Sequence, residues 1–173
     1  MDSSTIAAIR AGDTEKFGLL YDAYFPRIYR YIFYRTRDKE TAEDIVSTTF
    51  FKAVERLDMF DPIKGTFSAW LYRVARNTLY DHTRAKKHTE PLENAEAIPT
   101  SFETPGEAFD RKELVQKVRR LMDTLPVEQK EVISMRVWDE LSYGEIAHIL
   151  EKSEASCKML FHRGIVKLRA AAY

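Results

Sequence analysis

The sequence predicts an all-α protein of two small helical domains joined by a flexible acidic linker. We expect the first domain to be a helical bundle and the second to contain a helix-turn-helix. Apolar residues recur at helical spacing along nearly the whole chain, and no stretch alternates like a strand. A stretch with three prolines, His88 to Gly106, separates the halves. Near the end, Leu141 to Arg169 reads as two short helices with a tight turn, as in proteins that place a helix in the major groove of DNA.

Composition fits an ordinary soluble protein. The chain has 173 residues, of which 31% are charged and 45% hydrophobic. No apolar run approaches the ~20 residues needed to span a bilayer, and no secretory signal is visible at the start, so we expect no stable membrane insertion. Cys157 is the single cysteine and cannot form an internal disulfide. A reducing cytoplasm is therefore the expected location.

The net charge of zero is the sum of three segments that differ in charge. Residues 1–88 carry 15 Lys and Arg against 12 Asp and Glu, residues 89–110 carry none against 6, and residues 111–173 carry 12 against 9. Two mildly basic blocks thus flank an acidic link, which is either an interaction segment or a solvated spacer. We place the domains at 1–87 and 107–173, with the linker at 88–106.

The helical periodicity predicts eight helices, with a bend or break at Pro26 in the second. Their expected ranges are Thr5–Ala11, Thr14–Thr36, Lys39–Leu57, Thr66–Lys86, Pro105–Thr124, Glu128–Trp138, Ser142–Leu150 and Glu154–Ala171.

The helix expected over Lys39–Leu57 has two distinct faces. One is an apolar core stripe: Ala42, Val46, Thr49, Phe50, Ala53 and Leu57. The other carries Asp44, Thr48, Phe51 and Glu55. A phenylalanine among acids on an outer face predicts a docking site for a partner protein, unless Phe51 packs under a neighbouring loop.

The helix expected over Thr66–Lys86 combines basic and aromatic side chains. Phe67, Leu71, Val74, Ala75 and Thr78 form its inward stripe, and Arg73, Arg76, Asn77, Tyr80 and Arg84 share another face. Cations neutralise phosphates and rings stack on unpaired bases, so this face favours melted DNA. The preceding loop, Asp58 to Gly65, is placed to receive an extruded base. In the alternative interpretation, Trp70, Tyr72 and Tyr80 are core residues and the arginines are solvated.

The C-terminal pair of helices has clear start signals. Ser142 and Glu145 form a capping box, Glu151-Lys152 is the turn, and Ser153 caps the second helix. Its inward face is Cys157, Leu160, Phe161, Gly164, Ile165 and Leu168, and its outward face centres on Ala155, Met159, His162 and Val166. Ser156 and Arg163 flank that face on one side, and Lys158 and Arg169 on the other. Lys158 or Arg163 is the expected guanine contact.

These segments together resemble the sigma-70 family of bacterial sigma factors, in the small extracytoplasmic-function group. AEDIVSTTFFKAVERL (Ala42–Leu57) and FSAWLYRVARNTLYDHTR (Phe67–Arg84) resemble sigma region 2. LPVEQKEVISMRVWDELSYGEIAHIL (Leu125–Leu150) and the helix after it resemble region 4. The resemblance covers nearly the whole chain outside the linker.

The resemblance implies an alternative sigma factor that binds core RNA polymerase and directs promoter recognition, melting and initiation. Its first domain would bind the beta-prime clamp helices through Asp44, Thr48, Phe51 and Glu55. It would contact the −10 element through Asp58, Met59, Phe60, Lys64, Arg73, Arg76, Asn77, Tyr80 and Arg84. The second domain would dock on the beta flap and contact the −35 element through Ala155, Ser156, Lys158, Met159, His162 and Arg163. An anti-sigma factor is a further implied partner, and the linker would run towards the catalytic cleft and RNA exit path.

The sequence departs from the family pattern around the turn. Glu151 stands where the family usually has glycine, and Met159 where it often has arginine. Residues 155–158 read Ala-Ser-Cys-Lys instead of the frequent Gly-Thr-Val-Lys. The first departure bears on the shape of the turn and the others on which promoter sequence is read.

No enzyme motif is evident, and the four histidines lack metal-ligand spacing with each other or with Cys157, so we expect no catalytic residue, no metal, no cofactor and no small-molecule substrate. Three functions stay open at this point. The protein is a promoter-recognition subunit of RNA polymerase, a stand-alone helix-turn-helix regulator, or a helical adaptor that touches no nucleic acid.

Overall fold

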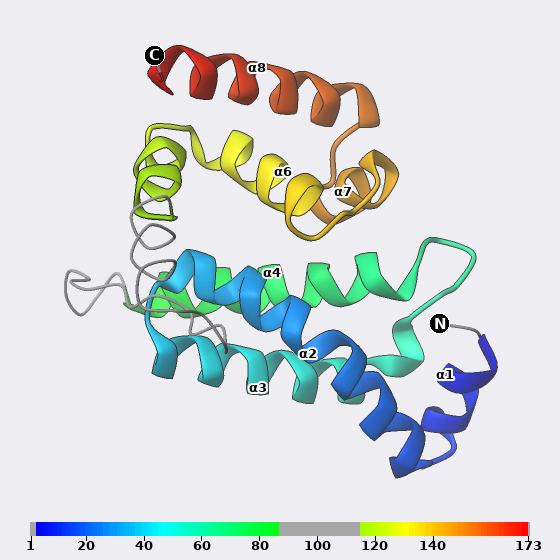
Figure 1. Cartoon of the computed structure of the whole chain (residues 1–173). Helices are drawn as coiled ribbons and strands as arrows, with labels where there is room; N and C mark the ends of the chain where they lie inside the picture. The colour runs from blue at the N-terminus through cyan, green and yellow to red at the C-terminus, as the bar shows by residue number, and fades with distance from the viewer. Residues whose placement is uncertain (1–2, 87–114, 173) are drawn as a thin grey trace, which may run out of the picture.

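The structure is a computed structural model that describes residues 3–86 and 115–172. Within these ranges it is all-helical, with no strand, as the sequence predicts (Figure 1). The N-terminal half consists of α1 (Ser3–Arg10), α2 (Thr14–Thr36), α3 (Lys39–Glu55), the short 3-10 helix η1 (Leu57–Met59) and α4 (Phe67–Lys86). The C-terminal half consists of a helical stretch over 115–123, α6 (Val127–Val137), α7 (Tyr143–Leu150) and α8 (Glu154–Ala172).

Helices α2 and α3 begin where aspartates cap them. The Asp13 carboxylate accepts from the Lys16 amide and the Asp38 carboxylate accepts from the Thr41 amide, at 3.0 and 2.8 Å. Such caps satisfy amides that have no partner within the helix. The expected helix ends agree with the observed ones to within two residues wherever the chain is described; the proposed linker and the first half of the helix expected over Pro105–Thr124 lie outside the described residues.

Pro26 does not break α2, so of the two expected effects, a bend or a break, the break is wrong. The helix is continuous from Thr14 to Thr36 with Pro26 inside it. Aromatic rings four residues apart stack along this part of the helix: Tyr21 on Phe25 before the proline, at 5.1 Å between centroids, and Phe25 on Tyr29 across it, at 5.7 Å. The contact of Phe25 with Tyr29 joins the turns before and after Pro26 and offsets part of the cost of the hydrogen bond that proline cannot donate.

The C-terminal half is a helix-turn-helix packed on α6. The capping box of α7 forms as expected, since the Glu145 amide donates to the Ser142 hydroxyl and the Ser142 amide donates to the Glu145 carboxylate. Gly164 lies where α8 meets α6, and a β-carbon there would approach Ile133 Cδ1 to 2.5 Å. The glycine therefore permits the close approach of these two helices.

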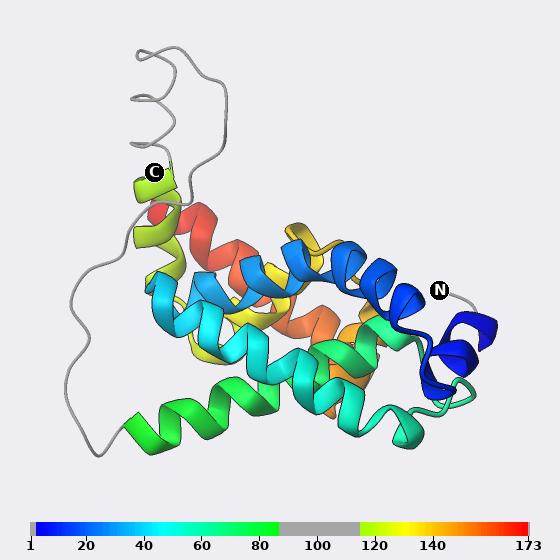
Figure 2. The same cartoon turned by 90° about the horizontal axis from the view of Figure 1, so that it is seen from below.

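The two halves pack against each other in this structure. Figures 1 and 2 show the C-terminal helices lying over α2 and α4, with α3 on the opposite side. One apolar core continues from the bundle into α6 and α7, and includes Tyr72 of α4 together with Val132, Met135 and Ile146. A tether alone, as the sequence indicated, does not describe this arrangement, because side chains from both halves share buried surface.

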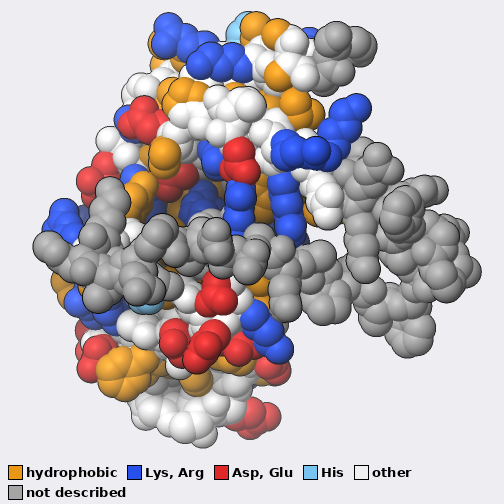
Figure 3. Space-filling view, turned by 90° about the vertical axis from the view of Figure 1, so that its left-hand side faces the viewer, with side chains coloured by type: hydrophobic (Ala, Val, Ile, Leu, Met, Phe, Trp, Pro, Cys, Tyr) orange, Lys and Arg blue, Asp and Glu red, His pale blue; other side chains and the backbone are white. Residues whose placement is uncertain are grey.

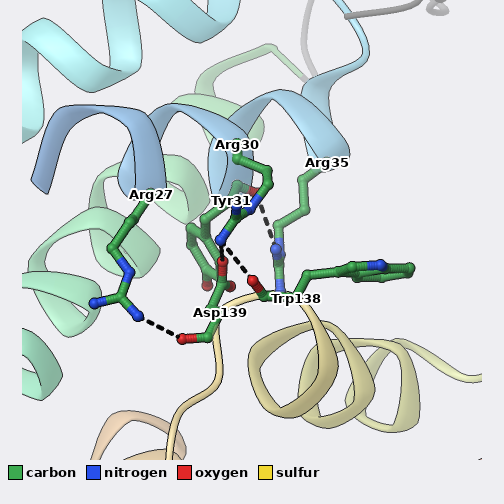
Figure 4. Close-up of polar contacts among 6 residues, drawn as sticks. All are labelled: Arg27, Arg30, Tyr31, Arg35, Trp138 and Asp139. Atoms are coloured by element: carbon green, nitrogen blue, oxygen red, sulfur yellow. Dashed lines mark hydrogen bonds and ion pairs between the residues drawn. The ribbon is translucent and has the colours of Figure 1, made fainter. Parts of the chain in front are cut away.

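A buried carboxylate anchors the contact between α2 and the loop after α6 (Figure 4). Arg30 donates to Asp139 Oδ1 at 2.9 Å and to the Trp138 carbonyl at 2.6 Å, and Arg27 donates to the Asp139 carbonyl at 2.9 Å. Asp139 is only 1% exposed. Burial raises the pKa of Asp139, and the nearby Arg30 opposes this shift only in part. A carboxyl group whose pKa is raised by folding destabilises the fold when it is ionised. The protein therefore gains stability at this contact as the pH falls through that raised pKa.

No described helix is both long enough and apolar enough to cross a membrane.

Candidate nucleic-acid interface

The loop that runs from Met59, the last residue of η1, to α4 presents apolar side chains to solvent. Asp61 organises it by accepting from the Ile63 amide at 3.0 Å. Met59 is 75% exposed and Ile63 is 93% exposed. Phe60, by contrast, is buried and packs on Phe67 and Trp70 with ring centroids 5.5 and 5.7 Å apart. The ring of Phe60 therefore holds the loop against α4 and leaves Met59 and Ile63 at its surface.

A hollow of about 260 Å³ lies beside this loop. This volume is slightly below the ~300–1,000 Å³ of typical small-molecule pockets. Four cationic side chains and two acidic ones line it: Lys52, Arg56, Lys64 and Arg73 against Asp61 and Asp81. Two cations are paired within the hollow, because Lys52 lies 3.2 Å from Asp81 and Lys64 lies 3.7 Å from Asp61. The lining side chains still carry more positive than negative charge, although Arg73 also lies 3.9 Å from Glu151. Together with the half-buried ring of Trp70 they suit an anionic, planar group such as a nucleotide.

The structure brings together about half of the residues expected at the −10 element. Those that line the hollow are Met59, Phe60, Lys64, Arg73 and Asn77. Arg76 and Tyr80 lie beside each other on α4 instead, with the guanidinium 4.7 Å from the ring centroid. Asp58 is exposed and pairs with Arg10 at 3.5 Å, and Arg84 is exposed on the last turns of α4.

The alternative interpretation, in which the α4 aromatics are core residues, holds fully for Tyr72 and in part for Trp70, which packs against the core. Tyr72 is completely buried, Trp70 is half-buried at the hollow, and Tyr80 is 42% exposed. Sequence reasoning missed Lys52 and Arg56 as lining residues. Their spacing of four, at the end of α3 and next to the loop, is a signal that would have found them.

A second basic surface lies on α8. Ala155, Met159, His162 and Arg163 are exposed, while Cys157 and Gly164 are buried, so the expected two faces of the helix are confirmed. Ser153 accepts from the Ser156 amide at 3.1 Å and caps the helix. Lys158 is exposed and is held by Glu154 at 3.7 Å. Figure 3 shows Lys and Arg side chains along the top of the molecule, over α8, and again near the level where the halves meet.

The turn before α8 uses a left-handed residue that is not glycine. Glu151 has φ 55° and ψ 44°, and its amide donates to the Ala147 carbonyl. A left-handed backbone is costly for any residue with a β-carbon. The turn therefore keeps the shape that the usual glycine would give, at a cost in stability.

Glu151→Gly is expected to raise the free energy of unfolding by about 1 kcal/mol, because glycine adopts this backbone without strain. Urea titration followed by circular dichroism measures the change. Glu151→Ala is the matched control, since it also removes the carboxylate but keeps the β-carbon. Equal stability of the two variants would contradict the backbone explanation.

The outer face of α3 is the third candidate surface. Asp44, Thr48, Phe51 and Glu55 are all exposed there, and the inward residues of the same helix are buried, as expected. Phe51 is 65% exposed, so the alternative in which it packs under a loop is wrong for the described part of the chain. Val54, which the sequence analysis did not single out, is 45% exposed one turn from Phe51. The two side chains place apolar surface among acids.

No three metal-binding side chains gather at one point in residues 3–86 and 115–172. Cys157 is buried in the core, and burial raises the pKa of its thiol. It is therefore a small packing residue and a poor nucleophile.

Comparisons with known proteins agree on one family. Residues 20–89 match the model of sigma-70 region 2, and residues 115–168 match that of sigma-70 region 4. The chain is 34% identical over 162 residues to the ECF RNA polymerase sigma factor BldN of Streptomyces coelicolor, covering 90% of this chain and 60% of BldN. It is 32% identical over 179 residues to the ECF RNA polymerase sigma factor SigW of Bacillus subtilis, covering 98% of this chain and 95% of SigW.

Two solved structures share the fold. CnrH, in complex with the cytosolic domain of CnrY, superposes with a TM-score of 0.74 at 24% identity, covering 97% of this chain and 94% of CnrH. The sigma factor RpoE of Bartonella quintana, in complex with the anti-sigma factor NepR, superposes with a TM-score of 0.73 at 20% identity, covering 90% of this chain and 96% of RpoE.

Proposed function

Because this chain belongs to the extracytoplasmic-function group of the sigma-70 family, we propose that its three exposed surfaces divide the work of a sigma factor. A sigma factor is a transcription initiation factor and not an enzyme. The N-terminal half docks on core RNA polymerase and opens the −10 element, and the C-terminal half holds the −35 element. The observation that carries this proposal is the basic hollow beside an exposed apolar loop.

In the proposed −10 contact, Arg73 and Arg76 neutralise backbone phosphates and the hollow receives a base turned out of the duplex. Extruding a base costs a few kcal/mol of unstacking. Stacking on the half-buried Trp70 ring and insertion of Met59 and Ile63 beside the separated strand would offset this cost.

In the proposed −35 contact, α8 enters the major groove with its exposed face. The side chains near its start reach base edges and the later ones meet phosphate. Arg163 can donate two hydrogen bonds to a guanine, whereas Lys158 acts as a point charge. Met159 stands where the family often has arginine and can offer a base only apolar contact. This difference would change which base is preferred at the position that the side chain faces.

Core polymerase binds, in this proposal, to the α3 face of Asp44, Thr48, Phe51 and Glu55, through its beta-prime clamp helices. Acids around an exposed apolar centre suit a partner with a basic rim. The C-terminal half would contact the beta flap. A protein that works on polymerase acts in the cytoplasm. An anti-sigma factor that covers the α3 and α4 faces would silence it, and the solved structure of the similar RpoE contains an anti-sigma factor, NepR.

Phe51→Ala is expected to weaken binding to core polymerase about 30-fold, since a central aromatic anchor is worth ~2 kcal/mol or more. Fluorescence anisotropy of labelled protein against purified core measures it. Met59→Ala removes a similarly exposed side chain from the promoter-facing loop and should leave core affinity unchanged. Equal losses in both variants would contradict the assignment of the α3 face.

Footprinting with and without core polymerase distinguishes the proposal from a stand-alone helix-turn-helix regulator. Protection of both promoter elements only when core is present is the expected result. A specific footprint from the protein alone would favour the regulator, and no footprint in either case would favour an adaptor without nucleic-acid binding.

A further inference from the structure

An arginine of the N-terminal helix ties down the backbone on which Met59 is carried. Arg10 is the last residue of α1. Its Nη2 donates to the Leu57 carbonyl at 2.8 Å and to the Phe60 carbonyl at 2.7 Å, and its Nε donates to the Leu57 carbonyl at 3.3 Å. The two carbonyls lie on either side of Met59, and both are about fifty positions from Arg10 along the chain. The arginine therefore joins two distant segments at the start of the promoter-facing loop.

The other hydrogen bonds of this stretch are short-range. The Met59 amide donates to the Arg56 carbonyl at 2.9 Å, and the Phe60 amide donates to the Leu57 carbonyl at 3.1 Å. Hydrogen bonds within a 3-10 turn have poorer geometry than those of an α-helix, so contacts from outside the turn decide how firmly it is held. The Phe60 ring supplies one such contact on α4, and the Arg10 guanidinium supplies another from α1.

Helix α1 is a firm support for this arginine. Ile6 and Ile9 are buried and belong to the core of the bundle, and α1 contacts both α2 and η1. The connection to α2 is short and folded back, since Gly12 has φ 93° and the Asp13 amide donates to the Ala8 carbonyl at 3.1 Å. Figure 1 shows α1 at the end of the bundle where the chain passes from α3 to α4. The core therefore fixes the place from which the Arg10 side chain reaches the loop.

Arginine suits this task because of its shape as well as its charge. A guanidinium presents its N–H donors in a rigid planar fork, and here the fork reaches two carbonyls at once. Arg10 also lies 3.5 Å from Asp58, but that carboxylate side chain is 90% exposed, so the ion pair contributes little. The main effect of Arg10 is therefore on the geometry of the backbone.

We infer that Arg10 is a positioning residue for promoter opening: by fixing the carbonyls of Leu57 and Phe60, it holds Met59 at the edge of the hollow. The inference rests on the proposed role of this loop at the −10 element. Met59 lines the hollow and is largely exposed, so the backbone beneath it decides where its side chain meets a separated strand. A displacement of about 1 Å can cost a large factor in rate when a group must be placed accurately. Arg10 acts through Met59 and does not itself touch the strand.

The test compares Arg10→Ala and Arg10→Lys with the parent chain, each reconstituted with core polymerase on a duplex promoter. Alanine removes every bond to the loop, whereas lysine keeps the charge but cannot reproduce the fork. Mobility shift measures initial promoter binding, and permanganate reactivity of unpaired thymines measures the rate of opening. We expect opening about tenfold slower in both variants, because charge-assisted hydrogen bonds are lost, with initial binding and core affinity within about twofold of the parent.

Lys16→Ala is the matched control, because it removes an exposed cation on the first turn of α2 and should open the promoter at the rate of the parent. Opening at the parent rate by Arg10→Lys would overturn the inference, since charge alone would then suffice. A loss of core affinity as large as the loss of opening would also overturn it, because it would indicate damage to the whole domain. Circular dichroism verifies that each variant keeps its helices.

A double-mutant cycle tests whether Arg10 acts through Met59. Met59→Ala slows opening by itself, and adding Arg10→Ala should slow it by less than about twofold more, because residues that act as a unit are not additive. Additive effects of the two changes would contradict the inference, since Arg10 would then act independently of Met59.

Amide hydrogen exchange of the free full-length protein provides a readout that needs no polymerase. The Met59 and Phe60 amides are expected to exchange about tenfold faster in Arg10→Ala, while the amide of Phe50, a buried residue of α3, should not change. Unchanged exchange at Met59 and Phe60 would overturn the inference. Failure of the proposed function is distinguishable: the parent and every variant would then fail to open promoters with core, whereas the faster exchange would still be seen.

Discussion

Replacing Arg73 and Arg76 together with alanine is expected to reduce open-complex formation about 100-fold or more. Each guanidinium would lose a charge-assisted contact with a phosphate, worth about 1.5–3 kcal/mol. The α3 face is untouched, so affinity for core polymerase should not change. Potassium permanganate reactivity of unpaired thymines, measured with reconstituted holoenzyme, reports the opening.

The control for this pair is Lys16→Ala with Lys39→Ala, which removes two exposed cations away from α4. Arg76→Ala also leaves Glu131 without its partner, so helicity must be compared before activity. Normal opening by the Arg73 and Arg76 variant would exclude α4 as the strand-reading helix.

Replacing Lys158 and Arg163 together with alanine is expected to weaken promoter binding by holoenzyme about 100-fold. A base contact of this kind contributes about 1–3 kcal/mol, and a lost phosphate contact adds to it. Electrophoretic mobility shift with a promoter fragment measures the loss. A fragment whose −35 element is scrambled should already bind weakly, and the variant should lower its affinity far less.

Arg163→Lys separates base recognition from charge, because lysine keeps the positive charge but cannot donate two parallel hydrogen bonds to one base. The expected outcome is a relaxed preference at one base pair with an unchanged dependence of binding on salt. Loss of salt dependence without any change in base preference would assign Arg163 to a phosphate instead.

Local structure was predictable because each signal lies within a few residues. The caps at Ser142 and Ser153, the two faces of α3 and the two faces of α8 follow from spacing alone. The expected break at Pro26 was wrong because the effect of a proline depends on its neighbours, and here stacked aromatic side chains hold α2 together. Glu151 shows the limit of residue preferences, since the fold imposes a left-handed backbone on a residue that disfavours it.

The packing of the halves could not be predicted in this way. Arg30 meets Asp139 across 109 positions of sequence, and His148 reaches the hollow from the other half of the chain. Single polar residues have no periodic pattern that identifies their partners. Nothing in the sequence distinguishes the buried acids Glu131 and Asp139 from acids that are exposed to solvent. The surfaces were therefore found one by one, but the contacts between the two halves emerged only from the tertiary structure.

In vitro transcription with purified core polymerase on a library of promoters tests the central assignment most directly. Start sites that appear only when the protein is added, and that disappear with Arg73→Ala and Arg76→Ala, are the predicted result. Core polymerase that initiates at the same sites with and without the protein would contradict it.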